Sequence, residues 1–166
     1  MRRRWWPLFV GLSMLAGTAQ AQESLVDRLA AAAPAANPQV LSLATRAADC
    51  ARRQGLLDGF HHLAVIDYSL PSTKPRLWVF DVEQGRLLFQ ELVAHGRNTG
   101  EQLAERFSNV EGSKMSSLGL FQAAETYYGS NGYSLRLRGL DPGFNDNALA
   151  RAIVMHGAPY VSEAIA

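Results

Sequence analysis

Two histidines occupy matching positions in this sequence, where an imidazole can act in acid–base chemistry. Each ends an apolar run and is followed at once by glycine: His95 by Gly96, and His156 by Gly157. Glycine lets the chain turn sharply, so we expect both imidazoles at strand ends, where loops gather. A free imidazole, with a pKa of about 6.5, is a good general base for a thiol or a hydroxyl. The alternative for each is a structural histidine at the core edge, hydrogen bonded to a carbonyl.

A general base needs a nucleophile, and the sequence contains no evident one. The single cysteine, Cys50, lies in a predicted helix, where we expect a partly buried structural residue. The serines lack both a Gly-x-Ser-x-Gly elbow and a Ser-x-x-Lys pattern. Serine catalysis therefore has little support.

A metal site is also poorly supported by the residue pattern. His61 and His62 are adjacent at the start of a predicted strand and would point to opposite faces of a sheet. No His-Glu-x-x-His or Cys-x-x-Cys pattern is present. A metal-dependent hydrolase that uses His95 and His156 is a third hypothesis, but no carboxylate ligands are clearly placed for it. We expect no metal and no cofactor.

The elements that position these residues are helices first and strands afterwards. Residues 22–36 are rich in alanine with leucines at helical spacing, and Asn37-Pro38 begins a second helix that Gly55 ends. From residue 60 onward the pattern predicts strands, with a short helical piece after a loop at 141–146. The predicted strands are 62–68, 76–82, 86–95, 118–127, 133–137 and 153–156. The aperiodic stretch 96–117 is long for a loop, which favours a functional role. The fold class is mostly β with an N-terminal helical lead-in.

The first 21 residues have the pattern of a secretory signal peptide. Residues 2–4 are basic, residues 5–16 are apolar, and residues 19–21 form a small-x-small cleavage site. The apolar part is shorter than the roughly 20 residues that span a bilayer. We therefore expect a periplasmic or secreted protein with no stable membrane insertion after cleavage.

Removal of the signal changes the charge balance. The chain has 16 basic and 15 acidic residues, and the signal takes three arginines and no acid. Residues 22–166 therefore carry 13 basic and 15 acidic residues, a net charge of −2. This charge gives no attraction to nucleic acid.

A more specific pattern runs through several short segments in a fixed order. These segments are 65–79, 94–96, 107–109, 113, 116–119, 134–137, 153–158 and 160–162. Together they resemble the murein L,D-transpeptidase catalytic-domain family, in its YkuD-like second branch. Combined with the patterns above, this resemblance gives three expected parts: a signal peptide over 1–21, an N-terminal helical segment over 22–58 and an L,D-transpeptidase-like catalytic domain over 59–166.

The resemblance implies a YkuD-like β-sandwich and cysteine acyl transfer in the cell wall. In that family a thiolate attacks the peptide bond after the meso-diaminopimelate of a tetrapeptide stem, and an amine of a second stem or of a lipoprotein resolves the acyl-enzyme. Carried over by position, His156 is the general base and the Gly157 carbonyl orients it. The stem peptides of peptidoglycan would be the partners. The implied substrate-binding residues are His95, Gly96, Asn109, Ser117, Gly119 and Tyr160.

The sequence departs from the family at the nucleophile. The family's cysteine lies in a Gly-Arg-Ser-x-Gly-Cys-Pro segment downstream of the histidine, and here the sequence ends ten residues after His156. Cys50 precedes all the strands and does not fit that role. We therefore expect a domain truncated before the catalytic cysteine, incomplete as a sandwich and inactive as given. The alternative is a non-catalytic periplasmic domain that binds peptidoglycan, with His156 structural.

Cleavage after Ala21 predicts a mature protein that begins at Gln22. The intact mass of the protein purified from its native cell checks this prediction. A mass equal to that of residues 22–166 supports both cleavage and truncation. A mass above that of residues 22–166 with Gln22 as the first residue would mean that the chain continues, and a Gly-Cys segment should then be sought and tested as the nucleophile. Retention of residues 1–21 would contradict the signal peptide.

Overall fold

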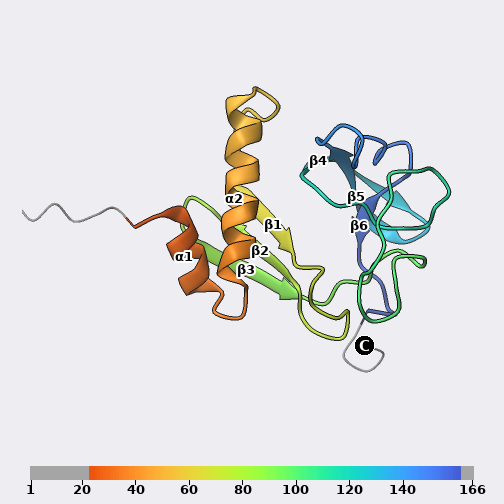
Figure 1. The fold of residues 1–166 in the computed structure, drawn as a ribbon, viewed down its shortest axis with the longest axis horizontal. Coiled ribbons are helices and arrows are strands. Elements are labelled where there is room, and N and C mark those ends of the chain that lie inside the picture. Colours follow the sequence, from red (N-terminus) through yellow and green to blue (C-terminus); the bar gives the residue numbers. More distant parts are fainter. Residues whose placement is uncertain (1–22, 162–166) are drawn as a thin grey trace, which may run out of the picture.

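The computed structural model describes residues 23–161, so the predicted signal peptide and Ser162 lie outside the described residues. Two helices precede six strands along the chain (Figure 1). The helices are α1 (Leu25–Ala32) and α2 (Pro38–Arg53). The strands are β1 (His62–Ile66), β2 (Leu77–Asp81), β3 (Arg86–Glu91), β4 (Phe121–Gly129), β5 (Gly132–Gly139) and β6 (Val154–His156). The predicted class, mostly β with an N-terminal helical region, is confirmed.

Side-chain caps fix where both helices begin. The Ser24 hydroxyl accepts a hydrogen bond from the backbone N–H of Asp27 at 3.2 Å, which starts α1. The Asn37 side chain accepts from the N–H of Gln39 at 2.9 Å, with Pro38 at the first helical position of α2. The prediction that Asn37-Pro38 begins a helix is confirmed.

The apolar core lies between the two helices and the first sheet. This sheet is antiparallel in the order β1-β2-β3, and its register pairs Leu63 with Phe80 and Val65 with Trp78. These four side chains point toward the helices, which cover that face in Figure 1. The buried cluster consists of Leu29, Ala33, Ala36, Leu41, Ala48, Leu63, Val65, Trp78, Phe80 and Val82. The helical segment is thus part of the same core as the first strands.

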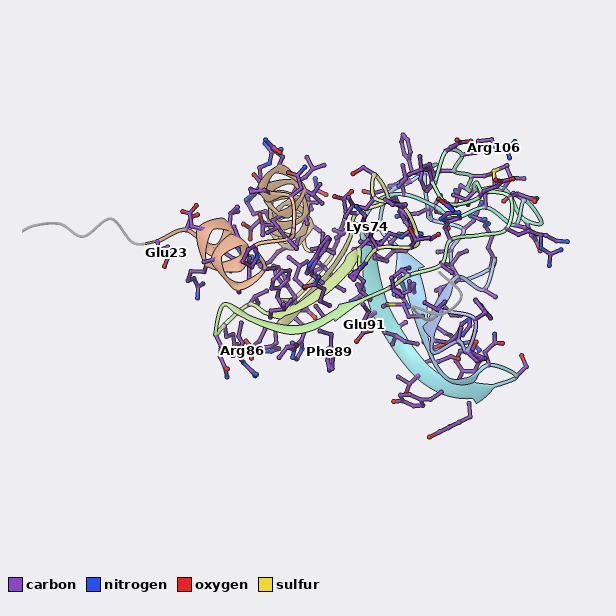
Figure 2. The ribbon with its side chains drawn as sticks, turned by 90° about the horizontal axis from the view of Figure 1, so that it is seen from below. Glu23, Lys74, Arg86, Phe89, Glu91 and Arg106 are labelled. Atoms are coloured by element: carbon purple, nitrogen blue, oxygen red, sulfur yellow. The ribbon has the colours of Figure 1, made fainter. Side chains whose placement is uncertain are left out.

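The second sheet is antiparallel in the order β4-β5-β6. Gly129 and Gly132 flank the tight turn between β4 and β5, and the β4–β5 register shifts between Ala123 and Thr126. Figures 1 and 2 show this sheet beside the first one, and no strand of one makes extensive contacts with a strand of the other. Among the described residues beyond 120, Ala148 is the buried apolar side chain, so this half has little apolar core.

The three largest departures from the predicted elements concern the end of β3, the start of β4 and the segment after residue 146. The strand predicted over 86–95 ends at Glu91, because the Val93 carbonyl accepts from the Arg76 side chain instead of a neighbouring strand. The strand predicted to start at 118 starts at Phe121, because the Leu120 N–H bonds to the Asp141 carboxylate. The helical piece predicted after residue 146 is a series of turns.

We predict that Phe80→Ala destabilises the protein by about 3–5 kcal/mol, because Phe80 is fully buried in the helix-covered core. Phe89 is the matched control on the neighbouring strand: it is 58% exposed and points away from the helices in Figure 2. Phe89→Ala should cost less than about 1 kcal/mol. Urea denaturation followed by far-UV circular dichroism measures both. Equal losses would contradict the placement of the core.

Candidate active site

His156 ends the edge strand β6 and is held by its own neighbour. Its Nδ1 lies 2.9 Å from the carbonyl oxygen of Gly157. A carbonyl only accepts, so Nδ1 carries the proton and donates it, which leaves the lone pair on Nε2. This is the contact that the family resemblance implies, and it gives His156 the tautomer of a general base at Nε2. Its catalytic role stays a prediction.

His156 belongs to a row of side chains across the second sheet. The register pairs His156 with Ser134 on β5, and Ser134 with Tyr127 on β4. Direct partners in antiparallel strands project to the same face, so these three side chains share one face. Ser134 is 2% exposed, and its hydroxyl donates to the Gly132 carbonyl at 3.1 Å. The imidazole therefore stands beside a buried hydroxyl at the middle of the row.

His95, the second predicted site histidine, has both ring nitrogens occupied. The Arg76 guanidinium donates from Nη2 to its Nδ1 at 2.8 Å. Its Nε2 lies 3.1 Å from the Gly100 carbonyl oxygen. An arginine only donates, so Nδ1 is the unprotonated nitrogen and Nε2–H donates to the carbonyl. This arrangement supports the structural reading of His95, and substrate binding by it stays a prediction.

Arg76 is completely buried and joins several segments of this region through its guanidinium. Its guanidinium also donates to the Val93 carbonyl from Nε and Nη2, and to the Leu70 carbonyl from Nη1, at 2.6–2.9 Å. It lies 5.0 Å from the centre of the Tyr68 ring. Burial lowers the pKa of Arg76 below its ordinary value, while Tyr68 and Asp67 oppose that shift. No carboxylate of residues 23–161 lies within 4.0 Å of the guanidinium, so carbonyl dipoles and a ring face stabilise this charge.

Sequence reasoning missed Arg76, although a signal was present. Strand alternation over 76–82 places Arg76 on the same face as Trp78, Phe80 and Val82, all of which are buried. An arginine on the apolar face of a strand requires partners for its donors. That alternation alone would have identified a buried guanidinium.

The long loop 96–117 is folded tightly onto itself. The Gly96 N–H donates to the Ser116 hydroxyl at 2.9 Å, and the Ser116 N–H donates to the hydroxyl of buried Thr99 at 2.8 Å. A Cβ on Gly96 would lie 2.6 Å from the Lys114 carbonyl oxygen, which real side chains do not tolerate. Glycine at position 96 is therefore explained by the close approach of two loop segments.

Arg151 fixes the other end of this loop from a distant part of the chain. Its Nη1 donates to the Ser108 carbonyl and the Ser117 hydroxyl, and its Nη2 donates to the Ser113 hydroxyl and the Met115 carbonyl. Ser117 is 6% exposed, and its hydroxyl also donates to the Ser108 carbonyl. Sequence reasoning missed Arg151, because its partners lie 34–43 residues away in a stretch without periodicity.

Asn109 joins the same loop to the turns that follow β5. Its side-chain amide donates to the Asp146 carboxylate at 2.6 Å and accepts from the Asn147 N–H at 3.2 Å. Gly119 has φ +115°, and a Cβ there would lie 2.3 Å from the Asp141 carboxylate. Both predicted residues thus lie against the turns around 141–147.

The predicted site residues fall into separate groups. His156 and Gly157 lie at the end of β6, His95 and Gly96 adjoin Arg76 and loop 96–117, and Ser117 is bound by Arg151. Tyr160 is 57% exposed and makes no side-chain hydrogen bond among residues 23–161. Among the described residues, no hydrogen bond joins the His156 side chain to any of the predicted substrate-binding residues.

Cys50 lies far from His156 in the fold. Cys50 is exposed on α2, so the prediction of a partly buried residue was wrong. Helix α2 packs on the first sheet, whereas His156 is on the second (Figure 1). Its sulfur lies 3.6 Å from the Gln54 amide nitrogen. The described residues therefore bring the His156 imidazole and the Gly157 carbonyl together, and they place no thiol beside them. Residues 23–161 also contain no group of three or more His, Cys, Asp or Glu side chains that could hold a metal ion.

We predict opposite neutral tautomers for the two histidines. Long-range ¹H–¹⁵N NMR at a pH where both rings are neutral should show Nδ1 unprotonated in His95 and Nε2 unprotonated in His156. His95→Asn and His156→Asn assign the signals. An Nε2–H tautomer at His156 would contradict its role as a base on that nitrogen.

Comparison with known proteins gives one match. A model of a family described as the L,D-transpeptidase catalytic domain (YkuD_2) matches residues 32–166. Neither a curated protein nor a solved structure matches the chain. The match begins within α1 and includes both histidine–glycine pairs, the long loop and the second sheet. The chain belongs to the L,D-transpeptidase catalytic-domain family.

Proposed function

We propose that this protein is exported and acts on the stem peptides of peptidoglycan by cysteine acyl transfer, with His156 as the general base. The observation that supports this most directly is the 2.9 Å contact between His156 Nδ1 and the Gly157 carbonyl, which leaves Nε2 free to take a proton. Family membership supports the substrate class. The net charge of −2 on residues 22–166 gives no support to a nucleic-acid partner. The described residues contain no helix that is long and apolar enough to cross a bilayer.

In this proposal the proton moves from the thiol to the leaving amine through His156. Nε2 takes the thiol proton as the sulfur–carbon bond forms at the scissile carbonyl. The imidazolium then returns that proton to the amine nitrogen as the carbon–nitrogen bond breaks. An incoming amine of a second stem attacks the thioester carbonyl and gives its proton to Nε2. The carbon–sulfur bond breaks, and the released thiolate takes that proton back from the imidazolium. The Gly157 carbonyl stays neutral throughout and keeps the ring in one orientation.

A second candidate is a domain that binds stem peptides without reacting with them. The observation that favours it is the separation of Cys50 from His156, since the described residues place no thiol at the base. In this candidate the His156–Gly157 contact shapes the end of β6 and does no chemistry. Binding of stems without a covalent step would then be the activity.

Acylation by a carbapenem distinguishes the two candidates, because only a competent thiolate opens the lactam and stays attached. Protein purified from its native cell should gain the mass of one carbapenem at the cysteine that the family resemblance implies downstream of His156, and not at Cys50. His156→Ala should slow this reaction by about 10²–10⁴-fold. His62→Ala is the matched control, because His62 is exposed on β1 and should leave the rate unchanged.

Peptide mapping of the adduct decides between the candidates. An adduct at Cys50 that is insensitive to His156→Ala would contradict acyl transfer at this site. Absence of any adduct, together with retained binding of a tetrapeptide stem, would establish the binding domain instead.

A further inference from the structure

Arg136 shares the sheet face that carries His156. It pairs with Val154 on β6, while Ser134, two residues earlier on β5, pairs with His156. Residues two apart on one strand project to the same face, so Arg136 lies diagonally across from His156. Such diagonal neighbours are about 7–8 Å apart, within reach of long side chains. One substrate residue can therefore contact both.

The guanidinium of Arg136 is held in place but retains free donors. Its Cζ lies 4.3 Å from the centre of the Tyr127 ring, and its Nε lies 3.1 Å from a carboxylate oxygen of Glu125. Within residues 23–161, Nη1 and Nη2 have no hydrogen-bond partner, and the side chain is 36% exposed. Tyr127 and Glu125 thus orient the group and leave its terminal nitrogens open.

The other two arginines with extensive contacts differ in this respect. Arg76 and Arg151 each use the guanidinium in four hydrogen bonds to carbonyls, hydroxyls or a ring nitrogen. Those two groups stabilise loops. Two open, parallel N–H donors are the arrangement that binds a carboxylate in bidentate fashion.

We propose that Arg136 binds the terminal carboxylate of the amino acid that is released from the donor stem, and so selects stems that end in a free carboxylate. The inference rests on the proposed function. His156 Nε2 must contact the nitrogen of the scissile amide, to which it returns the proton. In the released residue, a single carbon atom, Cα, separates this nitrogen from the carboxylate. A guanidinium diagonal to His156 is therefore placed for this carboxylate.

The competing explanation is a solvated surface pair between Arg136 and Glu125. Glu125 is 67% exposed, and such pairs contribute little to stability. In that case removal of Arg136 would leave peptide binding unchanged. Binding, and not stability, is thus the measurement that separates the two explanations.

Two synthetic tetrapeptide stems, one with a free C-terminal carboxylate and one with a C-terminal amide, form a matched pair of ligands. Isothermal titration of the full chain should give at least about tenfold tighter binding of the free acid. Arg136→Gln should bind both peptides alike. Arg136→Lys keeps the charge without the bidentate geometry and should keep only part of the preference.

Arg86→Gln is the matched control, because it removes the same charge from β3 of the other sheet. It should keep the full preference for the free acid, and circular dichroism should show that all variants fold. A wild-type protein that binds both peptides equally, or an Arg136→Gln protein that keeps the preference, would overturn this inference and leave the proposed function standing. A wild-type protein that binds neither peptide would overturn both.

Discussion

The buried guanidinium of Arg76 constrains how the two halves of this protein are joined. A positive charge taken out of water must be compensated at short range, and here two carbonyls, one imidazole nitrogen and a tyrosine ring do so. The donors of a guanidinium have fixed directions, so its partners have fixed positions relative to one another. The chain from Leu70 and the chain from Val93 to His95 therefore meet at one point. The long loop that leads to the second sheet begins from that point.

Beyond this junction, polar contacts take the place of an apolar core. The buried side chains that follow β3 are mainly polar: Thr99, Ser117, Ser134 and Asn145, with Ala148 as the apolar exception among the described residues. Arg151 and Asn109 add directional bonds from distant parts of the chain. Apolar packing tolerates small shifts, whereas hydrogen bonds require partners at set distances and angles. The stability of this half of the molecule therefore depends more on the exact positions of hydrogen-bonding groups than on buried apolar area.

Local rules predicted the elements well and the connections poorly. Asn37-Pro38 and the Gly129–Gly132 turn have mechanisms that act within a few residues, so their sequence predicts them directly. The end of β3 and the start of β4 depend on Arg76 and Asp141, whose partners lie 17 and 21 residues away. Within the site, the family resemblance implied the His156–Gly157 contact, which joins two adjacent residues. No short sequence pattern encodes strand register or loop closure. The hydrogen bonds of Arg76 and Arg151 and the orientation of Arg136 depend on both.

The His156–Gly157 contact has a consequence that concerns motion. The orienting group is a backbone carbonyl one residue away, so almost no chain must be closed to form the bond, and its entropic cost is small. When the edge of the sheet shifts, the ring and its orienting carbonyl travel together. If a carboxylate on another element oriented the ring, their hydrogen bond would break whenever the two elements moved apart. The tautomer of His156 is thus unaffected by fluctuations of the surrounding elements.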